Sequence, residues 1–554
     1  MTRRLLSELT GALRTAAPGV TARSRVHARI VAVAVMLALT LGMGGSAGAD
    51  SSPQEQALGE SIDRILGGKR LSGASSSVVV SDAASGRVLY SHDARRRLLP
   101  ASNTKLLTSS AAMDVLGPDY RYRTDVLARG DQDGGRLDGD LYLRGTGDPT
   151  LLAEDYDELA ADVADSGIKN VTGKLIADDT RFDSRRLGAS WAADDESAYY
   201  SSQISALSLA PDTDYDTGCV HLEVVPGSEP GEKPKVKMSP SNRYVTVKST
   251  ATTVAANGSD TLSVDREHGG NTITVSGGIP AGADPFESWT SVWEPTGYAA
   301  SVFADALKEH GVQVGGKTQL GRPTPDGARP VAGHKSMSLA KLSVPFMKLS
   351  NNNHAEVLTK TMGHETAGEG TWSAGLNAVE GFLKKAEVDT AAVRQVDGSG
   401  LSRMNNVPAG EIATLLHTVR DKPWFKKWYD ALPVACHPDR MTGGTLRSRM
   451  CDSPAELNAH AKTGSLTGAS SLSGYVKDAS GRQLAFSIIL NNYMDDSVKD
   501  IEDSIVEALA SYDGDKVRQD GTKSAEEDRS PDTGPRAPGS GGELECSWTR
   551  PARC

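Results

Sequence analysis

Two hairpin patterns lie near opposite ends of this 554-residue chain, and they constrain its fold more than any other feature. The first, SSSVVVSDAASGRVLYSHD, has strands at 78–80 and 87–90; the second, SLSGYVKDASGRQLAFSIILNNY, turns at 478–481. Helical patterns accompany both hairpins, whereas short alternating segments dominate residues 123–340. The pattern predicts an α/β (α+β) domain, an antiparallel sheet flanked by helices, interrupted by a large, mostly β insert.

The predicted boundaries divide the chain into five parts. Residues 1–49 resemble a secretory signal, because arginines precede an apolar run and Ala47-Gly48-Ala49 fits the small-x-small cleavage pattern. We predict cleavage after Ala49, with an uncleaved N-terminal anchor as the alternative. The interrupted domain is expected at 50–122 and 341–512, around an insert at 123–340, and 513–554 is expected to be a disordered tail. No later segment is apolar enough to span a bilayer, so we expect a secreted, extracytoplasmic protein, peripheral to a membrane at most.

Charge and cysteine content limit the partners and the compartment that we expect for this protein. The net charge of −11 argues against a nucleic-acid partner. Export implies an oxidising compartment, in which Cys436 and Cys451 are the best candidates for a disulfide that closes a loop. Cys546 and Cys554 could close a small ring, and Cys219 would then lack an internal partner.

A serine three residues before a lysine is the first pattern that could carry chemistry. In LPASNTKLLTSSAAM, Ser102 precedes Lys105 by about one helical turn, which places both side chains on one face. A serine attacks a carbonyl only when a base takes its proton. The pattern alone is weak, because Ser166–Lys169 and Ser338–Lys341 repeat it.

Two further motifs make the pattern specific. LSNNNHAE supplies a Ser-x-Asn at Ser350 and Asn352, which we expect on a helix, and AHAKTGSLTG supplies Lys462-Thr463-Gly464 before the second hairpin. S-x-x-K, S-x-N and K-T-G occur in the order that marks penicillin-recognising serine enzymes.

The similarity extends beyond these motifs. ASNTKLLTSSAA, GTGDPTL, DGSGLSR and AKTGSLTG resemble the low-molecular-mass class C penicillin-binding proteins, the D-alanyl-D-alanine carboxypeptidase/endopeptidase family, over about residues 54–512. The resemblance includes the large insert and implies a penicillin-binding/β-lactamase-like fold for the interrupted domain.

Chemistry and the resemblance together assign the expected roles. Ser102 is the expected nucleophile and Lys105 its base; a lysine must be neutral for this, which requires burial or a neighbouring cation. In this family Lys462 would supply that cation, Ser350 would relay the proton to the leaving amine, and Asn352 would hold the substrate amide. Thr463, Gly464 and Ser465, with the charge of Lys462, suit a terminal carboxylate, and the resemblance implies an oxyanion hole from the backbone N–H groups of Ser102 and Ser465.

A side-chain subsite is also expected in the insert. The resemblance suggests that ASWAADDESAYYSSQ, with Trp191, Asp194 and Tyr199, reaches over the cleft, where Arg403 and Leu466 would line the same subsite. A carboxylate with a guanidinium suits the zwitterionic end of diaminopimelate. The alternative is a surface ion pair at a domain junction.

Outside the predicted signal, the sequence lacks the motifs expected of a G-x-S-x-G hydrolase or of a metal-dependent enzyme. The G-x-S-x-G elbow occurs only at 44–48, inside the predicted signal, and no HExxH or comparable cluster supports a metal site. We interpret His354 and His460 as packing or surface residues, and expect no metal or organic cofactor.

The sequence therefore predicts a serine-type D-Ala-D-Ala carboxypeptidase/DD-endopeptidase that acts on peptidoglycan peptides through an acyl-enzyme, with β-lactams as covalent inhibitors. The alternatives are a β-lactamase, which the insert disfavours, and a non-catalytic cell-envelope binding protein.

Overall fold

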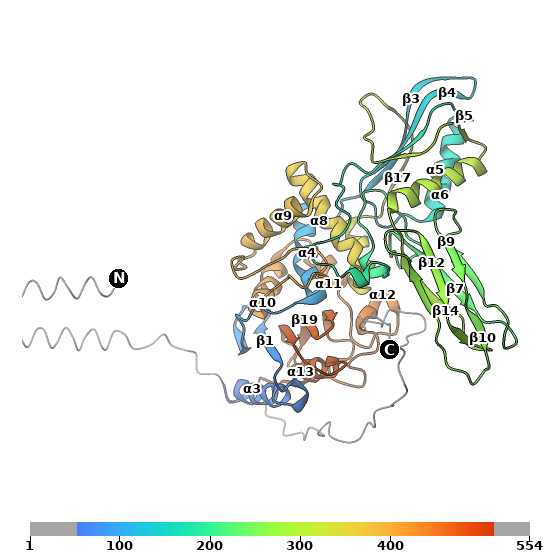
Figure 1. Cartoon of the computed structure of the whole chain (residues 1–554). Helices are drawn as coiled ribbons and strands as arrows, with labels where there is room; N and C mark the ends of the chain where they lie inside the picture. The colour runs from blue at the N-terminus through green and yellow to red at the C-terminus, as the bar shows by residue number, and fades with distance from the viewer. Residues whose placement is uncertain (1–51, 515–554) are drawn as a thin grey trace, which may run out of the picture. The chain divides into compact units, whose positions relative to one another are not determined.

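The computed structural model describes residues 52–514, and those from Gln54 onward belong to one compact unit (Figure 1). The predicted signal, its cleavage after Ala49, the Cys546–Cys554 ring and the tail beyond residue 514 lie outside the described residues.

Both predicted hairpins are confirmed, and they belong to the same sheet. The order of its five strands is β18-β19-β20-β1-β2, and every neighbouring pair is antiparallel. The strands are β1 (Ser75–Asp82), β2 (Val88–His92), β18 (His460–Leu466), β19 (Ala469–Lys477) and β20 (Gln483–Asn491). The central contact joins β1 to β20, so the two ends of the described chain close one sheet.

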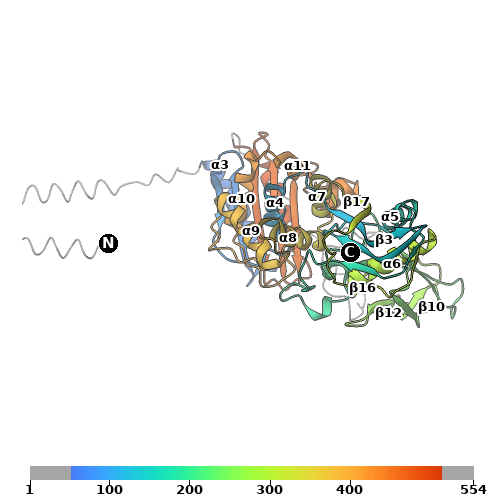
Figure 2. The same cartoon turned by 90° about the horizontal axis from the view of Figure 1, so that it is seen from above.

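Successive side chains of a strand point to opposite faces of the sheet. Apolar residues occupy successive positions in these strands, so both faces of the sheet are buried. Val79 and Ile489 pack into a core with α4, α8, α9, α10 and α11, which Figure 2 shows lying across one face. Val78 and Ile488 pack on the opposite face, with α3 and α13. The helices of this part are α3 (Pro53–Leu66), α4 (Thr104–Val115), α7 (Leu339–Lys348), α8 (Asn352–Ala367), α9 (Trp372–Lys385), α10 (Ala409–Thr418), α11 (Phe425–Asp430), α12 (Arg440–Gly443) and α13 (Lys499–Ser511), with 3₁₀ turns η1 (Lys69–Leu71), η2 (Ala101–Asn103), η5 (Val419–Asp421) and η6 (Gly444–Leu446).

The segment between α4 and α7 forms sheets of its own. A seven-stranded mixed sheet has the path β15-β5-β4-β3-β17; β6 also pairs with β4, and β16 pairs with β6. Helices α5 and α6 pack against this sheet. Three small sheets pair β14-β7-β8, β11-β12-β9 and β10-β13. The elements are β3 (Arg123–Asp133), β4 (Arg136–Gly145), α5 (Ala153–Asp165), β5 (Asn170–Val171), β6 (Leu175–Asp178), η3 (Ala193–Asp195), η4 (Tyr199–Ser201), β7 (Cys219–Val225), β8 (Lys235–Ser239), β9 (Thr246–Ser249), β10 (Thr252–Val254), β11 (Ser263–Arg266), β12 (Thr272–Ser276), β13 (Gly278–Pro280), β14 (Phe286–Ser291), α6 (Pro295–Glu309), β15 (Gln313–Val314), β16 (Gln319–Leu320) and β17 (Arg329–Lys335).

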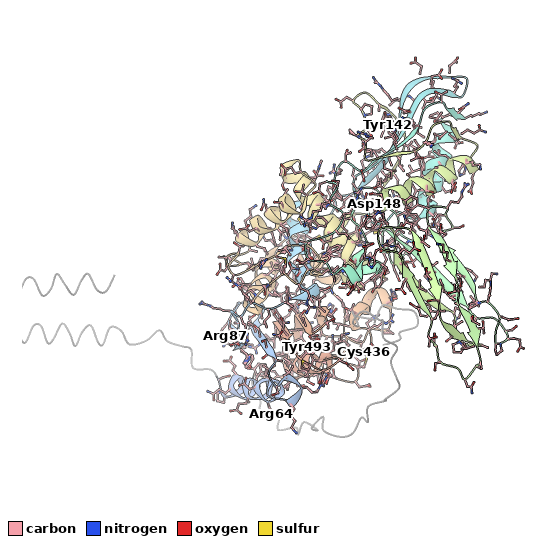
Figure 3. The ribbon with its side chains drawn as sticks, in the orientation of Figure 1. Arg64, Arg87, Tyr142, Asp148, Cys436 and Tyr493 are labelled. Atoms are coloured by element: carbon pink, nitrogen blue, oxygen red, sulfur yellow. A yellow bond between two sulfur atoms is a disulfide. The ribbon has the colours of Figure 1, made fainter. Side chains whose placement is uncertain are left out.

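The cysteines follow the sequence-based expectation where the structure describes them. Cys436 and Cys451 form a disulfide (Cys436 is labelled in Figure 3), and the Cys219 thiol is buried and unbridged. Within residues 52–514 none of the helices combines the length and apolar character that a membrane crossing requires.

Candidate active site

Ser102 lies in the 3₁₀ turn η2, directly before α4. The preceding residue, Ala101, has a left-handed φ of 45°, a conformation that costs a non-glycine residue about 1–3 kcal/mol and is enriched at functional sites. Hydrogen bonds to the sheet hold the turn: Ser471 Oγ donates to Pro100 O at 2.7 Å, and Asn103 Nδ2 donates to Lys462 O at 3.0 Å. These contacts fix the start of α4 against β18 and β19.

Lys105 follows in the first turn of α4 and is fully buried, with 0% of its surface exposed. Its Nζ lies 2.9 Å from Ser102 Oγ, 2.6 Å from Asn352 Oδ1 and 2.9 Å from Ser399 O. The predicted pairing of Ser102 with Lys105 is therefore present as a direct hydrogen bond. The other two S-x-x-K matches lie elsewhere: Ser166 ends α5, and Ser338 precedes α7.

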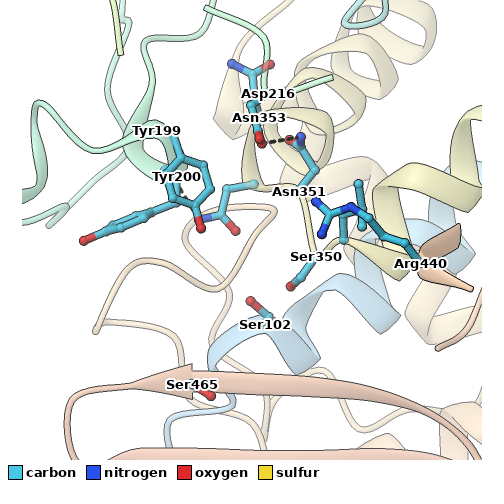
Figure 4. Close-up of a pocket in the computed structure, with 11 residues that line it drawn as sticks. Ser102, Tyr199, Tyr200, Asp216, Ser350, Asn351, Asn353, Arg440 and Ser465 are labelled. Atoms are coloured by element: carbon cyan, nitrogen blue, oxygen red, sulfur yellow. Dashed lines mark hydrogen bonds between the residues drawn. The ribbon is translucent and has the colours of Figure 1, made fainter. Parts of the chain in front are cut away.

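The Ser-x-Asn motif lies at a break between two helices, so our expectation that Ser350 lies on a helix is wrong. α7 ends at Lys348, α8 begins at Asn352, and Ser350 between them has a left-handed φ of 59°. Asn351 caps α8 by accepting a hydrogen bond from His354 N at 3.2 Å. The break turns the Ser350 hydroxyl away from the helix surface, and Figure 4 shows it pointing toward the hydroxyl of Ser102.

The Lys-Thr-Gly motif lies on edge strand β18. Lys462 is 0% exposed, and its Nζ donates to Ser350 Oγ at 2.7 Å. A Cβ on Gly464 would lie 2.8 Å from Ser102 N, closer than real Cβ contacts, so only glycine lets the strand approach the serine. Ser465 Oγ is buried and has no hydrogen-bond partner among residues 52–514, whereas Thr463 Oγ1 donates to Thr445 Oγ1 at 2.8 Å.

Four of the predicted motif residues, Ser102, Ser350, Asn352 and Ser465, line one cleft (Figure 4), whereas Lys105, Lys462, Thr463 and Gly464 are not among its lining residues. Its lining comprises Ser102, Tyr199, Tyr200, Asp216, Leu349, Ser350, Asn351, Asn352, Asn353, Arg440 and Ser465. Sequence reasoning missed Tyr200, Asp216, Leu349 and Arg440 in this set: Asp216 and Arg440 belong to none of the quoted segments, and Tyr200 and Leu349 directly adjoin the predicted Tyr199 and Ser350. Asn351 and Asn353 could have been found, since they flank the Ser-x-Asn asparagine.

The residues predicted for the side-chain subsite are only partly brought together. Tyr199 lines the cleft, and Trp191 Nε1 donates to Asp397 Oδ2 at 3.0 Å, in the loop that also carries Arg403. Arg403 is exposed and donates to Thr467 O at 2.8 Å, directly after Leu466. Asp194 is exposed, and within the described part of the chain no ion pair joins it to Arg403.

A buried acid, Glu356, holds the loop whose Ser399 carbonyl contacts Lys105. Glu356 is 0% exposed and accepts hydrogen bonds from Trp372 Nε1 at 2.7 Å, Gly398 N at 2.8 Å and Ser399 N at 2.8 Å. Burial, and secondarily the charge of Asp397, raises the pKa of the Glu356 carboxyl to about 7. Glu356 follows Asn352 by four residues and so lies on the same face of α8, a spacing by which the sequence could have revealed it.

The two histidines near the motifs pack as expected. His354 is fully buried, its Nε2 lies 3.0 Å from Tyr215 O, and burial lowers its pKa to about 3. His460 stacks on Tyr429 with ring centroids 4.4 Å apart. Among residues 52–514, no group of three or more His, Cys, Asp or Glu side chains is arranged to hold a metal ion.

Comparison with known proteins places this chain among peptidases of one family. The chain is 43% identical over 529 residues to the D-alanyl-D-alanine carboxypeptidase of Actinomadura sp. (strain R39), covering 95% of this chain and 96% of that protein. Its structure is similar to the crystal structure of penicillin-binding protein 4 from Haemophilus influenzae, with a TM-score of 0.71 and 26% identity over 81% of this chain and 98% of that one. A complex of the same Haemophilus protein with a novel β-lactam matches with a TM-score of 0.66 and 25% identity, at the same coverage.

These similarities confirm the expected fold class and the predicted family. The D-Ala-D-Ala carboxypeptidase 3 (S13) family matches residues 58–512, which contain all three motifs and both hairpins. The chain belongs to the D-Ala-D-Ala carboxypeptidase 3 (S13) family, and it is a serine-type peptidase.

Proposed function

We propose that this peptidase removes the terminal D-Ala from peptidoglycan stem peptides through an acyl-enzyme formed on Ser102. The observation that carries the proposal is the 2.9 Å contact between Ser102 Oγ and the fully buried amine of Lys105. A nucleophile within hydrogen-bond reach of a base that other groups orient is the arrangement that serine acyl transfer requires.

In the acylation step, Lys105 Nζ accepts the proton of Ser102 Oγ as this oxygen bonds to the carbonyl carbon of the penultimate D-Ala. The C–N bond to the terminal D-Ala then breaks as Lys105 returns this proton, through the hydroxyl of Ser350, to the departing amine. Burial of Lys105 and the presence of Lys462 in the same site are the two conditions that favour a neutral lysine. Water then hydrolyses the ester and frees Ser102.

The K-T-G strand is the proposed binding site for the terminal carboxylate of the substrate. Ser465 Oγ is a buried hydroxyl on the cleft wall without a partner in residues 52–514, so a ligand oxygen would satisfy it. Thr463 and the Lys462 ammonium lie next to it on β18. The close approach of Gly464 to Ser102 N supports an oxyanion hole formed by the N–H groups of Ser102 and Ser465.

We further propose that Trp191, Asp194, Tyr199, Arg403 and Leu466 recognise the zwitterionic end of a diaminopimelate side chain. The hydrogen bond from Trp191 to the loop of Arg403 supports this, because it brings the insert to the same side of the cleft. Replacing Asp194 with Ala should lower kcat/KM for peptides with a free diaminopimelate amine about 10-fold and leave amine-blocked peptides unchanged, since only the former pair with its carboxylate. An unaltered preference for the free amine in product-release assays would refute the subsite.

Hydrolysis of D-Ala–diaminopimelate cross-links uses the same acylation step with a larger leaving amine, so we propose endopeptidase activity as well. The proposed place of action is outside the cytoplasmic membrane, where peptidoglycan lies, and β-lactams would acylate Ser102 as substrate mimics.

The deciding experiment incubates the purified protein with D-Ala-D-Ala peptides and cross-linked muropeptides, with and without penicillin, and identifies the products. We expect release of D-Ala and of uncross-linked peptides, inhibition by penicillin, and no release by Ser102→Ala. Rapid turnover of penicillin without peptide cleavage would instead indicate a β-lactamase, and no turnover of either substrate a non-catalytic envelope protein.

A further inference from the structure

The surroundings of Lys105 Nζ determine which way its lone pair can point. Its contacts include three oxygens within hydrogen-bond distance: Ser102 Oγ, Asn352 Oδ1 and Ser399 O. A protonated lysine has three N–H bonds, whereas the neutral amine has two and one lone pair. A neutral Lys105 can therefore donate to only two of these oxygens, and its lone pair faces the third.

Two of the three oxygens can only accept. Ser399 O is a backbone carbonyl, and Asn352 turns its carbonyl oxygen toward Lys105 because its Nδ2 donates to Tyr200 O at 2.8 Å. A hydroxyl, by contrast, can donate. When Asn352 and Ser399 accept the two amine hydrogens, the remaining position directs the lone pair of Lys105 at the proton on Ser102 Oγ.

The position of Ser399 O depends on Glu356. One carboxylate oxygen, Oε1, accepts from Ser399 N and the other, Oε2, from Gly398 N, so both N–H groups of this peptide segment are held. The segment also lies directly on α8, since a Cβ on Gly398 would come within 2.6 Å of Ala355 O. On the other side, Thr108 Oγ1 of α4 donates to Gly398 O at 2.7 Å.

We propose that Glu356 is a positioning residue for the acylation step: by anchoring the N–H groups of Gly398 and Ser399, it places the Ser399 carbonyl so that the lone pair of Lys105 faces Ser102. This proposal rests on the proposed function. Helix α8 then holds both acceptors of the Lys105 amine. Asn352 lies on this helix, and Glu356, one helical turn later, holds the loop that carries the Ser399 carbonyl.

The testing variant is Glu356→Gln, which has the same shape. Its amide keeps one acceptor oxygen and replaces the other with an NH₂ group, so at least one loop N–H meets a donor instead of an acceptor. The matched control is Trp372→Phe, which removes the third donor to Glu356, Trp372 Nε1, and leaves the loop contacts in place.

We would measure the rate constant of acylation by benzylpenicillin separately from the dissociation constant of the non-covalent complex that precedes it. The Tm of each variant would be measured as well. We expect Glu356→Gln to acylate about 10- to 100-fold more slowly with a dissociation constant within about twofold of wild type, because misplacing a reacting group slows the step without weakening binding. We expect Trp372→Phe to lower the Tm and keep the wild-type rate constant.

Two results would overturn the proposal: wild-type acylation by Glu356→Gln, or rate constants of both variants that fall in step with their Tm. Failure of the proposed function is distinguishable in the wild-type protein itself, which would then form no adduct or would turn penicillin over rapidly without cleaving peptides.

Discussion

At the scale of single residues, burial separates one Ser-x-x-Lys pair from two others with the same spacing. Lys105 is fully enclosed, whereas Lys169 and Lys341 are exposed to solvent. Burial is one of the conditions under which a lysine becomes a base, and the two exposed lysines do not meet it. The motif occurs three times in the sequence, but only at 102–105 is the lysine buried beside its serine.

This difference gives a matched pair of variants. Lys105→Ala should slow acylation by penicillin about 10²- to 10⁴-fold, the contribution of a positioned general base, whereas Lys169→Ala should acylate at the wild-type rate. The rate of labelling by a fluorescent penicillin measures both. Equal labelling by the two variants would remove Lys105 from its proposed role.

At the scale of helices and strands, periodic patterns predicted the elements well, but not their irregular points. Both hairpins follow from the pattern of apolar residues. The break at Ser350 does not, because VPFMKLSNNNHAEVLTKTMG is helical in pattern throughout and a single left-handed residue leaves no periodic signal.

The contact between Lys105 and the Ser399 carbonyl could not be predicted from the sequence either. Ser399 acts through its backbone carbonyl, which every residue has, and it contacts a lysine 294 positions earlier in the chain. The motifs could be predicted because their chemistry lies in side chains at fixed spacing. The backbone carbonyl of Ser399 could not be predicted, because tertiary packing alone brings it to Lys105, whereas Asn352 belongs to a motif and Glu356 lies one helical turn after it.

The contact between β18 and η2 leads to a prediction at this scale. Gly464→Ala places a Cβ 2.9 Å from Pro100 O as well as against Ser102 N, and both are backbone atoms that cannot move aside. We expect this variant to lose at least 10-fold in acylation rate, because β18 must shift away from the serine. Gly481→Ala, in the β19–β20 turn with no atom within 4 Å of the added Cβ, is the control: its φ of +86° predicts a loss of about 1 kcal/mol in stability and an unchanged rate. Wild-type acylation by Gly464→Ala would contradict the steric argument.

At the scale of the whole molecule, the site is assembled from segments that are distant in sequence. The sheet pairs β1 with β20, and the segment between α4 and α7 contributes contacts to α8 through Tyr200 and Tyr215. His354 belongs to this junction: its neutral ring donates through Nε2 to Tyr215 O, and its Nδ1 is buried without a partner among residues 52–514.

The buried histidine makes global stability depend on pH. Burial lowers the pKa of His354 from 6.5 to about 3, so between these values the unfolded chain binds a proton that the folded protein does not. Stability contributed by the neutral ring is therefore complete above pH 6.5 and is lost as the pH falls, by about 2 kcal/mol between pH 6.5 and 5. We expect His354→Gln to lose less stability than wild type over this interval in denaturant unfolding. Parallel stability curves for the two proteins would show that His354 is protonated equally in both states.

Whether Ser102, beside the buried amine of Lys105, is the nucleophile is decided by locating the covalent adduct. The protein is incubated with benzylpenicillin, digested and analysed by tandem mass spectrometry. We expect one penicilloyl group per chain, on the peptide that contains Ser102 and on the Ser102 hydroxyl itself. An adduct on Ser350 or on any other residue, with Ser102 unmodified, would contradict this expectation.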